Sequence, residues 1–93
     1  MSEDAARIDV WLWRARFFKT RGLAARFVED GRVRRAQHGE QVRLDKASRT
    51  VRPGDHLVFA IGGRVIAIAV EALGERRGPA AEARALYTEL QNS

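Results

Sequence analysis

Hydrophobic residues near the start of the chain recur with the period of a helix. Between residues 8 and 18 they fall at intervals of three and four, which places them on one helical face. They are Ile8, Trp11, Leu12, Ala15 and Phe18. This spacing predicts a helix from about residue 9 to residue 18. Asp9 stands at its start, where a carboxylate can cap free backbone N–H groups or interact favourably with the helix dipole.

A second helical stretch follows after a short junction. Its apolar positions are Leu23, Ala24, Phe27 and Val28. Thr20 stands directly before this stretch, where its hydroxyl can cap the first turn of a helix. Gly31 comes directly after it and suits the left-handed position that closes a helix. We therefore predict a helix over residues 21–30 that turns sharply against the first one.

The middle of the chain has the pattern of short strands. Residues 32–36 and 41–44 are short runs with β-forming residues, and residues 51–55 contain the turn-forming pair Pro53-Gly54. We predict two strands here, joined by a polar connection over residues 36–40 and followed by turns.

Two longer β-forming runs, residues 56–61 and 64–73, flank a Gly-Gly pair. A two-residue loop of this kind is typical of a hairpin. The predicted register pairs Ile61 with Arg64 and aligns the apolar residues of both strands on one face, which should cover the helices. These apolar residues are Leu57, Phe59, Ile66 and Ile68.

The two ends of the chain differ from this central part. Residues 1–6 are expected to form a flexible tail, residues 7–74 one domain, and residues 75–93 a linker followed by a helix that packs on the domain. Pro79 suits the first turn of a helix. The apolar residues after it fall at i, i+3, i+4 and i+7, which predicts an amphipathic helix over residues 79–90. They are Ala83, Leu86, Tyr87 and Leu90.

Positive charge is concentrated in the first half of the chain. The 93 residues carry a net charge of +5, but residues 7–52 alone contain 13 Lys or Arg against 5 Asp or Glu. Fifteen of the 17 basic residues are Arg, which can contact phosphates through two N–H groups and can stack on bases. A clustered positive field of this kind favours a polyanionic partner, nucleic acid first and acidic lipid second.

Several classes of protein lack support in the sequence. There is no Cys and there are only two His residues, so we predict no disulfide, no metal site and no cofactor. No apolar run approaches the roughly 20 residues that span a bilayer, and the acidic N-terminus does not resemble a signal peptide. No catalytic motif is present, so we predict no catalytic residues and a cytoplasmic protein that contacts no membrane.

The chain resembles a known family in several segments. Residues 7–9 (Arg-Ile-Asp), 19–21 (Lys-Thr-Arg) and 31–33 (Gly-Arg-Val) are similar to the S4-type RNA-binding domain. Residues 11–13 (Trp-Leu-Trp) and 76–79 (Arg-Arg-Gly-Pro) make the chain more similar to the heat shock protein 15 family of ribosome-associated proteins. This resemblance spans nearly the whole chain.

The resemblance implies an α+β, S4-type RNA-binding fold. In this fold a two-helix wedge packs on a small, bent, mainly antiparallel sheet, and a short C-terminal helix follows. By position, the family implies that Asp9 fixes the start of the first helix. It implies RNA contacts at Arg7, Arg16, Lys19, Thr20, Arg21 and Arg32. Further basic residues on and after the helices complete the expected RNA-binding set: Arg14, Arg26, Arg34 and Arg35.

Two features depart from the family pattern. The family usually turns tightly after its first strand, often through Asn-Gly, whereas residues 36–42 are expected to form a longer connection here. Family members also often carry a long basic tail after the closing helix, whereas this chain ends at Ser93.

Two aromatic residues have alternative interpretations. Trp13 and Phe17 lie four apart in the first predicted helix, opposite its apolar face. They would form either a platform for an unpaired base or a surface that the C-terminal helix covers. We prefer the second interpretation because that helix needs an apolar surface to pack on.

The expected function is binding without catalysis. The resemblance implies a bacterial heat shock protein that recognises structured ribosomal RNA on the large ribosomal subunit and helps to handle stalled or dissociated subunits. We expect a monomer. One alternative is an RNA-binding module that works with a separate RNA-modifying enzyme, such as a pseudouridine synthase. Another is a general binder of single-stranded RNA or DNA.

Overall fold

The computed structural model describes residues 5–37 and 39–90. Most of the expected N-terminal tail therefore lies outside the described residues. Ala6, the last residue of that tail, is part of strand β1 (Ala6–Arg7), which pairs antiparallel with β4 (Thr50–Val51). Among the described residues no helix is long and apolar enough to cross a membrane.

The two predicted helices are present, although the first is shorter than predicted. Helix α1 spans Ile8–Arg14, and α2 spans Arg21–Glu29. The first helix ends four residues early because Arg16 adopts a left-handed backbone with φ of 66°, a conformation that a helix cannot continue through. The start of α2 agrees with the sequence prediction, since the Thr20 hydroxyl accepts a hydrogen bond of 3.1 Å from the Leu23 N–H.

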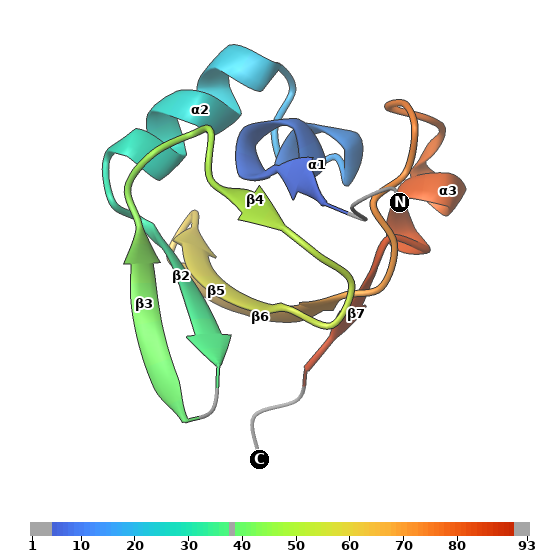
Figure 1. Ribbon diagram of the computed structural model, residues 1–93. Coiled ribbons are helices and arrows are strands. Elements are labelled where there is room, and N and C mark those ends of the chain that lie inside the picture. Colours follow the sequence, from blue (N-terminus) through green and yellow to red (C-terminus); the bar gives the residue numbers. More distant parts are fainter. Residues whose placement is uncertain (1–4, 38, 91–93) are drawn as a thin grey trace.

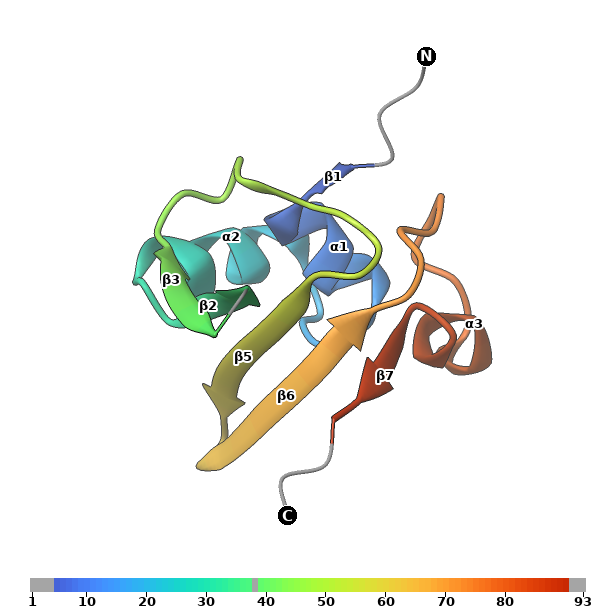
Figure 2. The same cartoon turned by 60° about the horizontal axis from the view of Figure 1, so that its bottom comes forward.

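Within the described residues, five strands form one antiparallel sheet in the order β3-β2-β5-β6-β7. Their bounds are β2 (Val33–Gln37), β3 (Glu40–Leu44), β5 (His56–Ile61), β6 (Arg64–Val70) and β7 (Tyr87–Glu89). Helices α1 and α2 lie over one face of this sheet (Figure 1), and β5, β6 and β7 run side by side (Figure 2). This α+β arrangement is the one that the family resemblance implied.

The predicted hairpin is confirmed in its register. Ile61 pairs with Arg64, and the pairs Phe59–Ile66 and Leu57–Ile68 follow. Both glycines of the loop have positive φ, as a tight hairpin turn requires. Leu57 and Ile68 are fully buried against the helices, so the apolar face of the hairpin forms one side of the core.

The connection between β2 and β3 is tighter than predicted. Gln37 pairs directly with Glu40, so the chain reverses over two residues instead of the longer loop expected for residues 36–42. Gly39 has φ of 80°, which suits such a turn. Residue 38 lies outside the described residues. The β2–β3 connection therefore has the tight form that the family resemblance implies.

The C-terminal segment was predicted wrongly in its second half. The helix α3 covers only Ala80–Arg84, and Tyr87–Glu89 form β7 instead of continuing the helix. The helical spacing of the apolar residues is real, but the edge of β6 offers unpaired backbone groups that β7 satisfies. Tyr and Thr also favour strands.

Most of the core lies between the two helices and the inner face of the sheet. Trp11, Leu12 and Val28 are fully buried from the helix side, and Val33 and Leu44 from the sheet side. The Trp11 Nε1–H also donates a 2.8 Å hydrogen bond to the Ala72 carbonyl. The helical stripes predicted from sequence therefore do form the core.

Candidate nucleic-acid interface

The junction between α1 and α2 presents positive charge at a helix N-terminus. Lys19 and Arg21 are exposed on either side of Thr20, whose side chain caps α2. The first N–H groups of a helix and the positive end of its dipole favour an anion. The hydroxyl of Thr20 accepts the Leu23 N–H, so its role here is to order the turn. The arrangement suits a phosphate group beside Arg21.

The opposite end of α2 leads to a second group of cations. Arg32 and Arg34 are exposed at the start of β2, directly after the turn at Gly31. The guanidinium carbon of Arg32 lies 4.7 Å from the centre of the Phe27 ring, a cation–π contact that orients the side chain. A nine-residue helix is about 13 Å long, so the two groups of cations are separated by about that length of α2.

Arg26 lies on the exposed side of α2 between these groups. It borders a shallow hollow of about 220 Å³ with Phe18, Leu23, Phe27 and Asp30. The Leu23 side chain is 46% exposed, which makes the hollow partly apolar. Arg26 therefore adds an exposed cation between the two groups, beside the acidic Asp30.

Five of the predicted residues are available to a partner. None of their side chains has a hydrogen bond or ion pair with another described residue. These five, called the α2 cation set below, are Lys19, Arg21, Arg26, Arg32 and Arg34. Lys19 and Arg21 lie at the start of α2, Arg26 on its exposed side and Arg32 just after its end, whereas Arg34 lies on the outer face of the sheet. Their contact with RNA stays a prediction.

Arg7 has a partner inside the protein. Its guanidinium forms a bidentate pair with Asp9, with distances of 3.1 Å from Nε and 3.0 Å from Nη2. Asp9 is only 3% exposed and also accepts the Val10 N–H. The hydrogen bond and charge of Asp9 raise the pKa of Arg7 above its ordinary value. Arg7 thus compensates a buried carboxylate at the start of α1, in agreement with a structural role for Asp9.

Two more predicted residues hold the linker after β6. The Arg14 Nη1 donates to the Gly74 carbonyl at 2.8 Å, and the Arg16 Nε donates to the Gly78 carbonyl at 2.7 Å. Sequence analysis placed both residues on the RNA-binding surface, but it did not anticipate these contacts because the partners lie about 60 residues away. Whether the remaining N–H groups of these arginines reach RNA stays a prediction.

Arg35 also has partners inside the protein, on strand β4 and in the turn before β5. Its Nη1 donates to the Thr50 carbonyl at 3.0 Å and lies 3.6 Å from the Asp55 carboxylate. Arg35 pairs across the sheet with the buried Leu57, so it lies on the inner face, opposite Arg34. Its expected RNA contact also stays a prediction.

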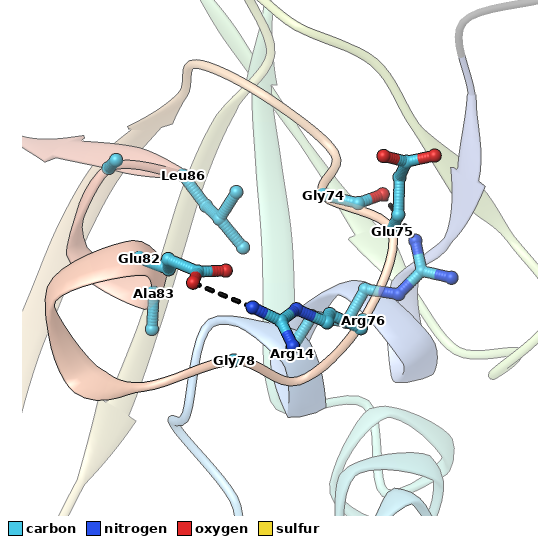
Figure 3. Close-up of a pocket in the computed structure, with 9 residues that line it drawn as sticks. Arg14, Gly74, Glu75, Arg76, Gly78, Glu82, Ala83 and Leu86 are labelled. Atoms are coloured by element: carbon cyan, nitrogen blue, oxygen red, sulfur yellow. Dashed lines mark hydrogen bonds and ion pairs between the residues drawn. The ribbon is translucent and has the colours of Figure 1, made fainter.

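A cavity of about 330 Å³ lies where the linker passes α3 (Figure 3). Arg14 and Arg76 line it together with Glu75 and Glu82, and Arg76 forms an ion pair of 2.8 Å with Glu82. Because both signs of charge are present, the cavity does not offer the excess positive charge that a phosphate would need.

The aromatic residues of the α1–α2 junction are partly covered. The Phe17 ring centre lies 4.8 Å from that of Tyr87 and 5.2 Å from that of Phe59. Tyr87 therefore covers Phe17, but from strand β7 and not from the C-terminal helix that the sequence predicted. Trp13 and Phe17 do not share a helix face, because α1 ends before Phe17.

Arg16 allows a direct test of its contact with the linker. Arg16→Ala removes the bond to Gly78 and should lower the free energy of unfolding by about 1 kcal/mol. Arg16→Gly removes the same bond but relieves the left-handed backbone. It should be more stable than the alanine variant by roughly 0.5–1 kcal/mol. Chemical denaturation measures both. If Arg16→Ala is as stable as the parent, the contact with Gly78 does not hold the linker.

Comparison with known proteins agrees with this geometry. A family model described as the S4 domain matches residues 6–38, which include α1, α2 and β2. The heat shock protein 15 homolog of Haemophilus influenzae is 39% identical over 93 residues, covering 100% of this chain and 67% of that protein. Heat shock protein 15 of Escherichia coli is 39% identical over 87 residues, covering 94% of this chain and 62% of that protein.

A solved structure supports the same relationship. The structure described as trimeric Vibrio cholerae heat shock protein 15 superposes with a TM-score of 0.78 at 37% identity, covering 92% of this chain and 82% of that one. The fold and the matched segment define an S4-domain protein, with the RNA-binding module of that class. Within that class, the chain belongs to the heat shock protein 15 family. It spans about two thirds or slightly less of the length of these curated relatives.

One basic residue that the sequence analysis did not select lies next to a selected one. Arg43 on β3 pairs directly with Arg34 on β2, which places both side chains on the outer face of the sheet. The signal was available in principle, since a two-residue turn between the strands fixes this register. The prediction of a longer β2–β3 loop did not place Arg43 opposite Arg34.

Proposed function

We propose that this protein binds structured ribosomal RNA on the large ribosomal subunit, in the cytoplasm, and acts in the handling of stalled or dissociated subunits. The observation that carries the proposal is the α2 cation set in a chain of the heat shock protein 15 family. These cations have no described acidic partner, so an RNA backbone would supply the missing negative charge. The proposed activity is binding, without a chemical step.

The mechanism is electrostatic capture of a folded RNA element. Phosphates would contact Arg21 and the start of α2 at one end, and Arg32 and Arg34 at the other. The core below α2 keeps the helix in place, so the cations are positioned before RNA arrives. Because double-stranded RNA is recognised mainly by shape and backbone, we expect discrimination by RNA fold more than by sequence.

The first experiment is sedimentation of the tagged protein with purified ribosomal subunits. We expect the protein in the large-subunit fraction, and its displacement by ribosomal RNA but not by unstructured oligonucleotides. Equal competition by unstructured DNA would favour a general single-stranded nucleic-acid binder. Sedimentation of the free protein would also test the expected monomer, since the Vibrio cholerae relative is described as trimeric.

Salt dependence of RNA binding gives a quantitative test. If the protein neutralises about 4–6 phosphates, the logarithm of the binding constant should fall against the logarithm of salt concentration with a slope of roughly −3 to −5. The reason is the release of counterions from the RNA. Fluorescence anisotropy over a range of salt concentrations measures the slope. A slope near zero would rule out phosphate capture by the α2 cation set.

A further inference from the structure

A shallow hollow lies on the outer face of the sheet, away from the helices. It has a volume of about 300 Å³ and is lined by Arg32, Arg34, Val58, Phe59, Ala60 and Val65. Arg34 pairs with Val58, and Ala60 pairs with Val65. The residues between them, Val33 and Phe59, point into the core and are buried. The strand register therefore assigns the arginines and the small apolar residues to the same outer face.

The floor of the hollow is apolar and open. Val65 is 67% exposed, the most exposed large hydrophobic residue among the described residues. Val58 and Ala60 beside it are half-buried. Helices α1 and α2 cover the opposite face of the sheet (Figure 1). Val58, Ala60 and Val65 line one hollow, so a single flat apolar group could cover all three.

The rim of the hollow carries unbalanced positive charge. Arg34 faces Arg43 directly across β2 and β3, and like charges at such positions destabilise a sheet. A Cβ at Gly31 would lie 3.0 Å from Cδ and 3.7 Å from Nη1 of Arg43, so this guanidinium lies near the residue that precedes Arg32. Neither Arg34 nor Arg43 has a hydrogen bond or ion pair with another described residue. An anion at this place would relieve the repulsion.

An apolar floor with guanidinium groups at its rim matches the chemistry of an unpaired nucleotide. The base and ribose would cover Val58, Ala60 and Val65, and the flanking phosphates would contact the arginines. Arg32 or Arg34 could also stack on the base, since guanidinium planes serve this purpose. The floor offers no polar side chain, so the identity of the base would matter little.

We propose that this outer hollow binds an unpaired nucleotide next to the folded RNA element held by α2. The inference rests on the proposed RNA-binding function and extends it to single-stranded RNA. It also predicts that the preferred RNA contains a helix with a single-stranded extension or an unpaired residue. A base-paired nucleotide could not lay its base on the floor of the hollow.

The test compares two RNAs: a blunt RNA hairpin and the same hairpin with a short single-stranded uridine extension. The extension should strengthen binding by about tenfold, the effect of one added phosphate contact or of covering the apolar floor with one base. Val65→Glu should abolish this gain, because it places a negative charge in the hollow. Val42→Glu is the matched control. It makes the same change at a residue that is 44% exposed and pairs with Arg35, on the other face of the sheet.

Each outcome has a distinct meaning. Loss of the gain in Val65→Glu, with the gain retained in Val42→Glu, supports the inference. If the unaltered protein binds both RNAs equally, the inference is wrong while the proposed function stands. The inference is also wrong, and the proposed function also stands, if Val65→Glu keeps the full gain in affinity. If neither RNA binds, both proposals fail. If Val65→Glu instead converts an oligomer to a monomer in sedimentation, the hollow is an interface between copies, which also overturns the inference.

Discussion

Replacement of Leu12 by alanine is expected to lower the free energy of unfolding by about 2–5 kcal/mol. Leu12 is fully buried in the core formed by the helices and the inner face of the sheet. Its truncation removes apolar burial and leaves a cavity that the surrounding structure closes only in part. Since a domain of this size has a total stability of roughly 5–15 kcal/mol, the loss is a large fraction of it. Chemical denaturation at constant temperature measures the effect.

The matched control for Leu12 is Leu23 on the second helix. Leu23→Ala deletes the same atoms, but the side chain is 46% exposed, so we expect a loss under about 1 kcal/mol. RNA affinity of the Leu12 variant should equal that of the parent at a temperature where it is folded, since the residue reaches no surface. Equal losses in the two variants would mean that the helices are not packed as described.

Replacement of Lys19 and Arg21 together by alanine is expected to weaken RNA binding while leaving stability unchanged. Each charge-assisted contact with a phosphate is worth on the order of 1 kcal/mol or more, so the pair should cost about thirtyfold in affinity or more. Stability should change by roughly 0.5 kcal/mol or less per site, as for other surface positions. The salt slope of binding should also become shallower by about 2. Binding titrations and thermal melts measure these effects.

A charge-matched control separates specific contacts from net charge. Arg84 is exposed in the last turn of α3, away from α2 (Figure 1). Arg84→Ala removes one positive charge and should have a much smaller effect on binding than Arg21→Ala, which removes the same charge beside the start of α2. If the Lys19/Arg21 variant binds RNA like the parent, the surface lies elsewhere, and Arg32 and Arg34 become the next residues to change. Arg16 is unsuitable for this experiment because it also holds Gly78.

Local sequence patterns were sufficient for the elements whose partners are close in the chain. The hairpin was predicted in register, since a two-residue Gly-Gly loop leaves one way to pair its strands. The second helix was predicted to within one residue at its end, because Thr20 caps its start and Gly31 follows it. The concentration of arginine before residue 52 likewise required only the sequence.

Tertiary contacts determined where the first helix ends and which structure forms after α3. The spacing of Leu86, Tyr87 and Leu90 suits a helix, yet Tyr87 lies in a strand because the open edge of β6 needs hydrogen-bond partners. The first helix stops early at the left-handed Arg16, whose side chain is bound to Gly78 from the far end of the chain.

For the basic residues, too, the sequence determined one part of the picture and the tertiary structure the other. The sequence by itself determined that they cluster around the two helices and the following strand, and the family resemblance indicated RNA as their partner. Only the tertiary structure separated arginines that hold the protein together, such as Arg14 and Arg35, from those left exposed, such as Arg21 and Arg34. The physical reason is that a guanidinium group serves equally well for a backbone carbonyl and for a phosphate. Its role depends on which acceptor the fold brings within reach.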